Sequence, residues 1–157
     1  MCYNTTRKSM NKRYEHTQVG YVIITVVAAA MVLIGVILAT AGMSWAGIAV
    51  LVILGVILVL FSGLTVTIWD DTLEVRFGPG LIRKRFKLQD IESWQIVKNP
   101  WYYGWGIRLT PHGYLYNVSG FHAVEIKLRR GARYRIGTNA RRELEEALRQ
   151  ATEAWIR

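Results

Sequence analysis

Charged residues are missing from one long stretch near the start of the chain, and this gap dominates its pattern. No Asp, Glu, Lys or Arg occurs in the 54 residues between Glu15 and Asp70. As a helix rising about 1.5 Å per residue, this stretch would be about 80 Å long, against about 30 Å for the hydrocarbon core of a bilayer. The gap therefore predicts two membrane-spanning helices, at about 19–40 and 45–64, rather than one.

A short turn separates the two predicted spans. The segment Ala41-Gly42-Met43-Ser44-Trp45 supplies a flexible glycine, a serine that can start a helix, and a tryptophan that favours the membrane interface. No charged side chain lies inside either span, so the hairpin is predicted to be an anchor and not a transporter. A cleavable signal peptide is the alternative, but the first apolar region is longer than usual and a second one follows it at once.

Positive charge flanks the gap on both sides. The chain carries a formal net charge of +9, of which the segment up to Glu15 contributes +3 and the remainder +6. Because Lys and Arg near membrane spans stay on the cytoplasmic side, both termini are predicted to face the cytoplasm at the inner (plasma) membrane. Residues 1–18 are accordingly predicted to be a basic cytoplasmic tail.

After the gap, apolar and polar residues alternate, which is typical of strands. The alternation is clearest at 73–77, 82–88, 124–128 and 133–136. A helical repeat then places Leu144, Ala147, Leu148, Ala151 and Trp155 on one face of a helix predicted at about 139–156. The predicted fold class is a transmembrane α-helical hairpin followed by a mainly-β domain at 65–157, with about seven antiparallel strands in a bent sheet or barrel capped by one C-terminal helix.

Three segments of this domain carry a resemblance to a known family. They are Asn99-Pro100-Trp101-Tyr102-Tyr103-Gly104-Trp105-Gly106-Ile107-Arg108, Leu115-Tyr116-Asn117-Val118-Ser119-Gly120 and Arg135-Ile136-Gly137-Thr138. With the strand and helix order, they resemble the bacterial membrane proteins that carry a PH-like (pleckstrin homology) domain. The resemblance covers about 64–156 and the preceding anchor, and it implies this fold and a membrane location. That family is known by these properties rather than by an established activity.

The first candidate site is a basic strand. Its residues are Arg83, Lys84, Arg85 and Lys87, which follow the second predicted span closely. Each Lys or Arg beside an anionic membrane contributes about 1 kcal/mol, so these residues are candidates for contact with lipid headgroups. The alternation places Lys84 on the apolar face and the other three outward, and a simply solvated strand face is the alternative.

The second candidate site is an aromatic loop. It contains Trp101, Tyr102, Tyr103 and Trp105, with Arg108 just beyond. Such residues can form an interfacial belt, a partner-binding surface or the cap of a small hydrophobic core.

No pattern in the chain predicts catalysis. His112 and His122 lie ten residues apart, and the single cysteine, Cys2, lies outside the domain. No catalytic residue, cofactor or metal site is therefore predicted, and a short membrane tether disfavours nucleic acid as a partner. The predicted function is a non-enzymatic binding or scaffold module for a protein partner or anionic lipid headgroups, with homo-oligomers as a further hypothesis. The alternative is an accessory subunit of a larger membrane enzyme or transporter complex.

Overall fold

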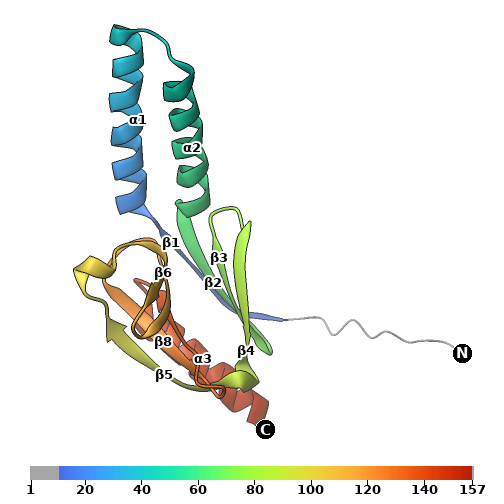
Figure 1. The fold of residues 1–157 in the computed structure, drawn as a ribbon. Coiled ribbons are helices and arrows are strands. Elements are labelled where there is room, and N and C mark those ends of the chain that lie inside the picture. The colour runs from blue at the N-terminus through green and yellow to red at the C-terminus, as the bar shows by residue number, and fades with distance from the viewer. Residues whose placement is uncertain (1–10, 157) are drawn as a thin grey trace, which may run out of the picture.

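A pair of apolar helices projects from a β-rich body (Figure 1). The computed structural model describes residues 11–156. Helices α1 (Tyr21–Ala41) and α2 (Trp45–Phe61) contact each other, and none of their residues is fully buried. Helix α1 is long and apolar enough to cross a membrane, and α2 is a shorter apolar helix of 17 residues.

The turn between the helices follows the predicted chemistry. The Ser44 hydroxyl accepts a hydrogen bond from the Gly47 amide at 3.1 Å, which satisfies one of the free donors at the start of α2. The two helices approach closely at Gly47, where an added Cβ would collide with Leu38. The helix pair therefore packs through a small residue near its tip.

The helix pair is inserted between two neighbouring strands. Strand β1 (Lys12–Val19) leads into α1, and α2 leads into β2 (Gly63–Trp69). These strands pair antiparallel from Val19 opposite Gly63 to Lys12 opposite Trp69. At the base of the helices, the Gly20 amide donates to the Ser62 carbonyl at 2.8 Å. Residues 12–18 of the segment predicted to be a tail thus belong to a strand of the body, and the first helix begins at Tyr21 rather than at residue 19.

The hydrophobic pattern did not predict strand β1, because polar side chains make the contacts of this strand with the core. Tyr14 packs against the core, and Gln18 is buried. The Gln18 amide donates to the Ser119 carbonyl at 2.7 Å, so this buried polar group is held by the body. The strand has no aliphatic residue before Val19. The rest of the predicted tail, residues 1–10, lies outside the described residues.

Two sheets form the body. The first has the antiparallel order β1-β2-β3-β4 and the second the order β5-β8-β9-β7-β6, in which β7 and β9 pair in parallel. The remaining bounds are β3 (Thr72–Phe77), β4 (Ile82–Lys87), η1 (Leu88–Asp90), β5 (Ile91–Lys98), η2 (Trp101–Tyr103), β6 (Gly106–Thr110), β7 (Gly113–Asn117), β8 (His122–Leu128) and β9 (Arg133–Gly137). The predicted mainly-β class is confirmed, but the described residues form nine strands in two sheets rather than about seven antiparallel ones.

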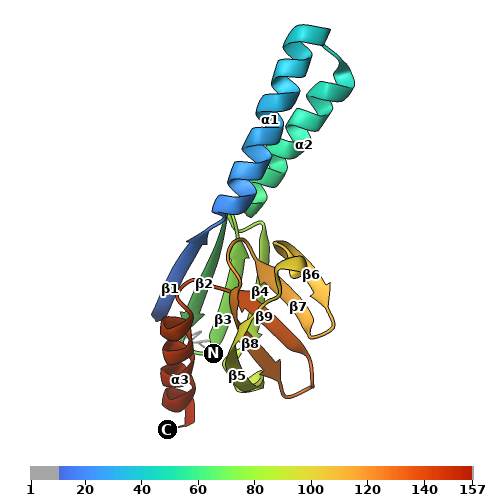
Figure 2. The ribbon, with the colours of Figure 1, turned by 90° about the vertical axis from the view of Figure 1, so that its left-hand side faces the viewer.

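The core lies between the inner faces of the sheets, with a C-terminal helix beside it. Helix α3 (Arg141–Ile156) contacts β1, β2, β5 and β8, and it lies beside β1 (Figure 2). Its Leu144, Leu148 and Ala151 are buried, as the helical repeat predicted. The side chain of Trp155, also assigned to that face, lies outside the described ones.

The body touches the helix pair at one end, called here the helix end. The Phe61 and Phe77 rings meet edge to face with centroids 5.5 Å apart. Beside them, the Gly78 amide donates to the Gly63 carbonyl at 2.8 Å. Gly78 has a φ of +48°, and a Cβ there would collide with the carbonyl oxygens of Val59 and Leu60. The β3–β4 turn is therefore wedged against the last turn of α2.

Replacing Gly78 with alanine should loosen this junction. The positive φ alone costs a Cβ-bearing residue about 1 kcal/mol, and the collision with backbone carbonyls adds to it, so Gly78→Ala should destabilise the protein by about 2 kcal/mol or more. The control is Gly131→Ala, because Gly131 also has a positive φ (+87°) but has open space around it. Melting temperatures in a mild detergent should fall clearly further for Gly78→Ala. Equal losses in the two variants would refute the wedge.

Candidate functional site

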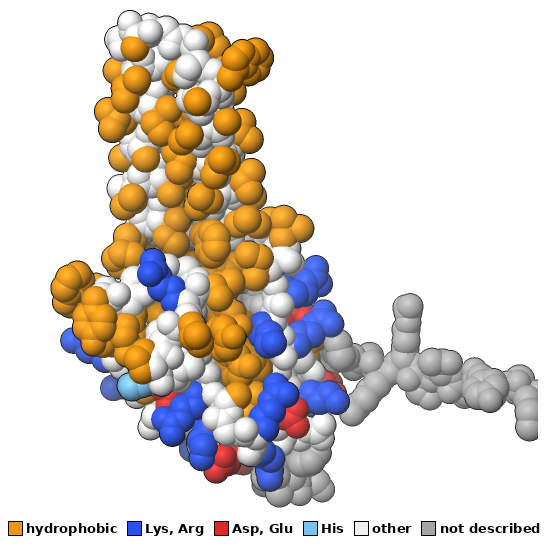
Figure 3. All heavy atoms as spheres, in the orientation of Figure 1, with side chains coloured by type: hydrophobic (Ala, Val, Ile, Leu, Met, Phe, Trp, Pro, Cys, Tyr) orange, Lys and Arg blue, Asp and Glu red, His pale blue; other side chains and the backbone are white. Residues whose placement is uncertain are grey.

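Exposed hydrophobic side chains gather at the helix end of the body. Leu81, the last residue of the β3–β4 turn, is 77% exposed, and Trp101 and Tyr102 in η2 are 77% and 65% exposed. In Figure 3, the hydrophobic surface of the helix pair continues onto the body, and a separate cluster lies at the place that η2 occupies in Figure 1. Large exposed apolar groups that lie together are typical of binding surfaces, which makes this end of the body the candidate site.

The aromatic loop divides into an exposed and a packed half. Trp101 and Tyr102 meet edge to face at 6.1 Å, and Tyr102 meets Tyr103 in the same way at 5.1 Å. Tyr103 and Trp105 are half-buried, and Trp105 packs against Phe121 at 6.3 Å. The second half of the loop thus packs against the body, in the manner of a core cap, and fixes the exposed first half in place.

A buried ion pair supports the start of this loop. The Arg135 guanidinium donates through Nε to the Glu125 carboxylate at 2.7 Å and through Nη1 to Asn99 Oδ1 at 3.1 Å. All three residues are buried. This network is not predictable from the sequence pattern, because Glu125 and Arg135 occupy the polar positions of alternating strands, which predict exposure. Asn99, the third member of the network, is the first residue of the connection from β5 to β6, which contains the aromatic loop.

Arg108 lies beside an apolar groove between β6 and the helix pair. The groove, of about 440 Å³, is lined by Ile23, Ile57, Phe61, Trp105, Gly106, Ile107 and Arg108. The Arg108 Nε donates to the Trp105 carbonyl at 3.3 Å, and within residues 11–156 no carboxylate forms an ion pair with its guanidinium. The groove thus combines apolar walls with one unneutralised cation.

The four predicted basic residues do not form one patch at the helix end. Strand β4 starts beside Phe77 and runs away from the helices, so Arg83 lies near the helix end and Lys87 lies opposite Thr72 at the other end. Arg85 forms an ion pair with the buried carboxylate of Glu74. Lys84 shares its face with Phe86, as predicted, but it is exposed because β4 is the edge strand of its sheet.

His122 lies opposite Lys98 where β8 starts and β5 ends. Burial lowers the pKa of His122 below its usual value of 6.5, and the positive charges of Arg141 and Lys98 lower it further. The described residues contain no group of three His, Cys, Asp or Glu side chains that could hold a metal ion.

Comparison with known proteins gives no match. No family model matches the chain, and neither a curated protein nor a solved structure matches it.

Removing Arg135 should destabilise the body strongly. Arg135→Met leaves the Glu125 carboxylate buried without its main partner, which should cost about 3 kcal/mol. The control Arg133→Met removes an exposed arginine 3.8 Å from the same carboxylate and should cost about 1 kcal/mol or less. The double variant Glu125→Leu with Arg135→Met should recover part of the loss, because no charge is then left buried. Thermal unfolding in detergent measures the stability of all three variants. If Arg135→Met is as stable as Arg133→Met, the buried ion pair does not stabilise the body as described.

Acid should weaken the fold through His122. The folded protein resists protonation of this ring, whereas the unfolded chain takes up the proton near pH 6.5, so stability should fall as the pH drops below about 6.5. His122→Gln should flatten the dependence of melting temperature on pH between 5 and 8. Arg141→Gln should reduce it, since one of the repelling charges is gone. An unchanged profile in both variants would show that another group is responsible.

Proposed function

We propose that this protein is a membrane-anchored, non-enzymatic binding module with a PH-like domain, which engages anionic lipid headgroups at the cytoplasmic face of the inner membrane. One observation carries the proposal. Leu81, the exposed half of the aromatic loop and the Arg108 groove all lie at the end of the body from which the apolar helix pair emerges. A bilayer that contains the helices would meet these residues at its surface.

The strand pairing supports a two-span anchor. Because β1 and β2 pair along their length, both ends of the helix pair lie on the same side of any membrane that the helices enter. Helix α2 is about 26 Å long at about 1.5 Å per residue, so modest thinning of a core of about 30 Å accommodates it. Tyr21 at the base and Trp45 near the tip are exposed, and such aromatic side chains favour the two membrane interfaces.

The same pairing argues for retention of α1 in the mature protein. Cleavage after Ala41, as in a signal peptide, would remove β1 together with α1. The first sheet would then lose an edge strand, and the buried contacts of Tyr14 and Gln18 would be lost with it. The positive charge on both sides of the helix pair supports a cytoplasmic location for the body.

Lipid contact would orient the body rather than attach it. The helix pair supplies the hydrophobic attachment, whereas each cation near the anionic surface adds about 1 kcal/mol. Arg108 and Arg83 lie near the helix end, and the exposed rings of Trp101 and Tyr102 at the same end suit the headgroup region. Two sheets and a C-terminal helix that packs on them are compatible with the proposed PH-like domain.

The depth of the aromatic loop tests the proposal. In a Cys2→Ser background, a nitroxide label at Tyr102→Cys should be shielded from a water-soluble relaxation agent in nanodiscs with anionic lipid, and shielded less in zwitterionic ones. The control label at Pro111→Cys lies on the exposed turn between β6 and β7, at the end away from the helices. It should stay accessible in both. Equal accessibility at the two positions would rule out lipid contact and favour a protein partner for the loop.

A further inference from the structure

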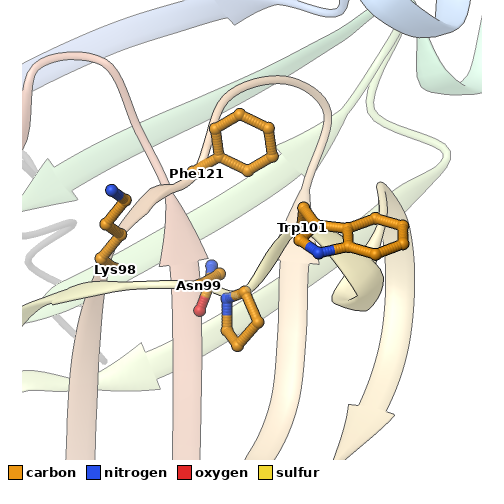
Figure 4. A pocket seen from close by; sticks show the side chains of 5 residues that line it. Lys98, Asn99, Trp101 and Phe121 are labelled. Carbon is orange, nitrogen blue, oxygen red and sulfur yellow. The ribbon is translucent and has the colours of Figure 1, made fainter.

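A second cavity opens where β5 meets the aromatic loop. It has a volume of about 430 Å³ and is lined by Lys98, Asn99, Pro100, Trp101 and Phe121. Figure 4 shows the rings of Phe121 and Trp101 flanking the opening, with Lys98 on the side away from Trp101. This cavity, called here the Asn99 pocket, is separate from the Arg108 groove, whose lining residues it does not share.

Asn99 brings an unused hydrogen-bond donor to this pocket. The residue is 3% exposed, and its Oδ1 accepts the hydrogen bond from Arg135 Nη1. A guanidinium can only donate, so the atom that contacts it must be the amide oxygen, and the orientation of the amide is thereby fixed. The Nδ2 group is buried and has no hydrogen-bond partner within the described part of the chain. A buried donor without a partner costs about 1–3 kcal/mol, which an acceptor on a ligand would relieve.

Lys98 adds a positive charge next to this donor. Its side chain is exposed, and among residues 11–156 no carboxylate forms an ion pair with it. The neighbouring ionisable groups are His122, opposite Lys98 in the strand pair, and Arg141, which acts on His122. Neither of these groups is acidic, and the buried carboxylate of Glu125, which the Asn99 network also contains, is neutralised by its ion pair with Arg135. The pocket therefore favours a negatively charged ligand.

The other walls of the pocket are apolar. Pro100, Trp101 and Phe121 form them, and Trp101 and Phe121 are partly exposed without a ligand. The volume lies in the range of pockets that hold small molecules, which combine hydrophobic walls with a few placed polar groups. A ligand that fits needs an acidic oxygen at one end and an apolar body at the other.

We propose that the Asn99 pocket binds an amphiphilic anion, with a phosphate or carboxylate oxygen held by Lys98 and Asn99 Nδ2 and an apolar ring or chain between Trp101 and Phe121. Two sources share this chemistry, namely an anionic phospholipid of the adjacent bilayer and a soluble organic acid. The site goes beyond the proposed function, because it requires a ligand inside a pocket and not only contact between a surface and headgroups.

Binding of phenyl phosphate to the full chain in zwitterionic nanodiscs tests the pocket. Saturation-transfer NMR on the aromatic protons of the probe should give saturable binding to the wild type. Asn99→Asp keeps an acceptor for Arg135 but replaces the donor with a negative charge, so it should weaken binding about tenfold or more. Lys98→Gln should weaken binding several-fold. Lys87→Gln removes the same charge at the opposite end of the body and should leave affinity unchanged.

The outcomes separate the source of the ligand from the existence of the site. If anionic lipid in the nanodisc displaces the probe from the wild type, the natural ligand is a bilayer lipid, whereas lack of displacement identifies a soluble acid. Melting temperatures close to that of the wild type confirm that the variants fold. If Asn99→Asp does not fold, the affinity of Lys98→Gln alone decides whether the pocket binds the probe. Unsaturable binding to the wild type, or equal affinity in Lys98→Gln, Asn99→Asp and Lys87→Gln, would overturn the proposal.

Discussion

The pairing of β1 with β2 is the constraint on which the arrangement of the molecule depends. It joins the two ends of the helix pair, because one strand enters the helices and the other leaves them. A domain tied to an anchor by one flexible linker samples many orientations. Here two connections lie side by side, closed by the bond between Gly20 and Ser62, and the Phe61–Phe77 contact and the wedged Gly78 brace them. The groove and the aromatic loop are therefore held at a fixed height beside the helices.

The net charge of the body does not show which of its basic residues are free to attract an anion. Each of two buried carboxylates lies among arginines: Glu74 between Arg76 and Arg85, and Glu125 between Arg133 and Arg135. These arginines balance buried acids and are only partly available for a ligand. Lys98 and Arg108 form no ion pair within the described residues, and both line cavities at the helix end. The basic residues that can attract an anionic ligand are thus those without a neighbouring carboxylate, and the total number of basic residues does not identify them.

The gap in charge and the helical repeat predict the apolar helices and α3 from sequence, because each depends on a local pattern of side chains. Strand β1 was missed because the side chains it turns inward are polar: Tyr14 and His16 are half-buried and Gln18 is buried, and a hydrophobic pattern does not detect such residues. The Asn99 pocket could not be predicted either, since Phe121 reaches it from another loop and the orphan donor of Asn99 exists only after Arg135 has bound its oxygen. The sequence also could not show that Arg83 lies near the helices and Lys87 far from them, because this depends on which end of β4 meets the helix pair.

The position of β1 also bears on the order in which the molecule can be assembled. During synthesis β1 emerges before the helix pair, but its partner β2 appears only after both helices have been made. In the proposed membrane setting, β1 must therefore wait on the cytoplasmic side while the helix pair inserts. Once α2 is in place, Val19 and Gly63 are brought together by the hairpin itself, so little of the loop-closure entropy remains to oppose their pairing. Membrane insertion would then act as the nucleating step for the first sheet. That sheet could be completed only after both helices have been inserted.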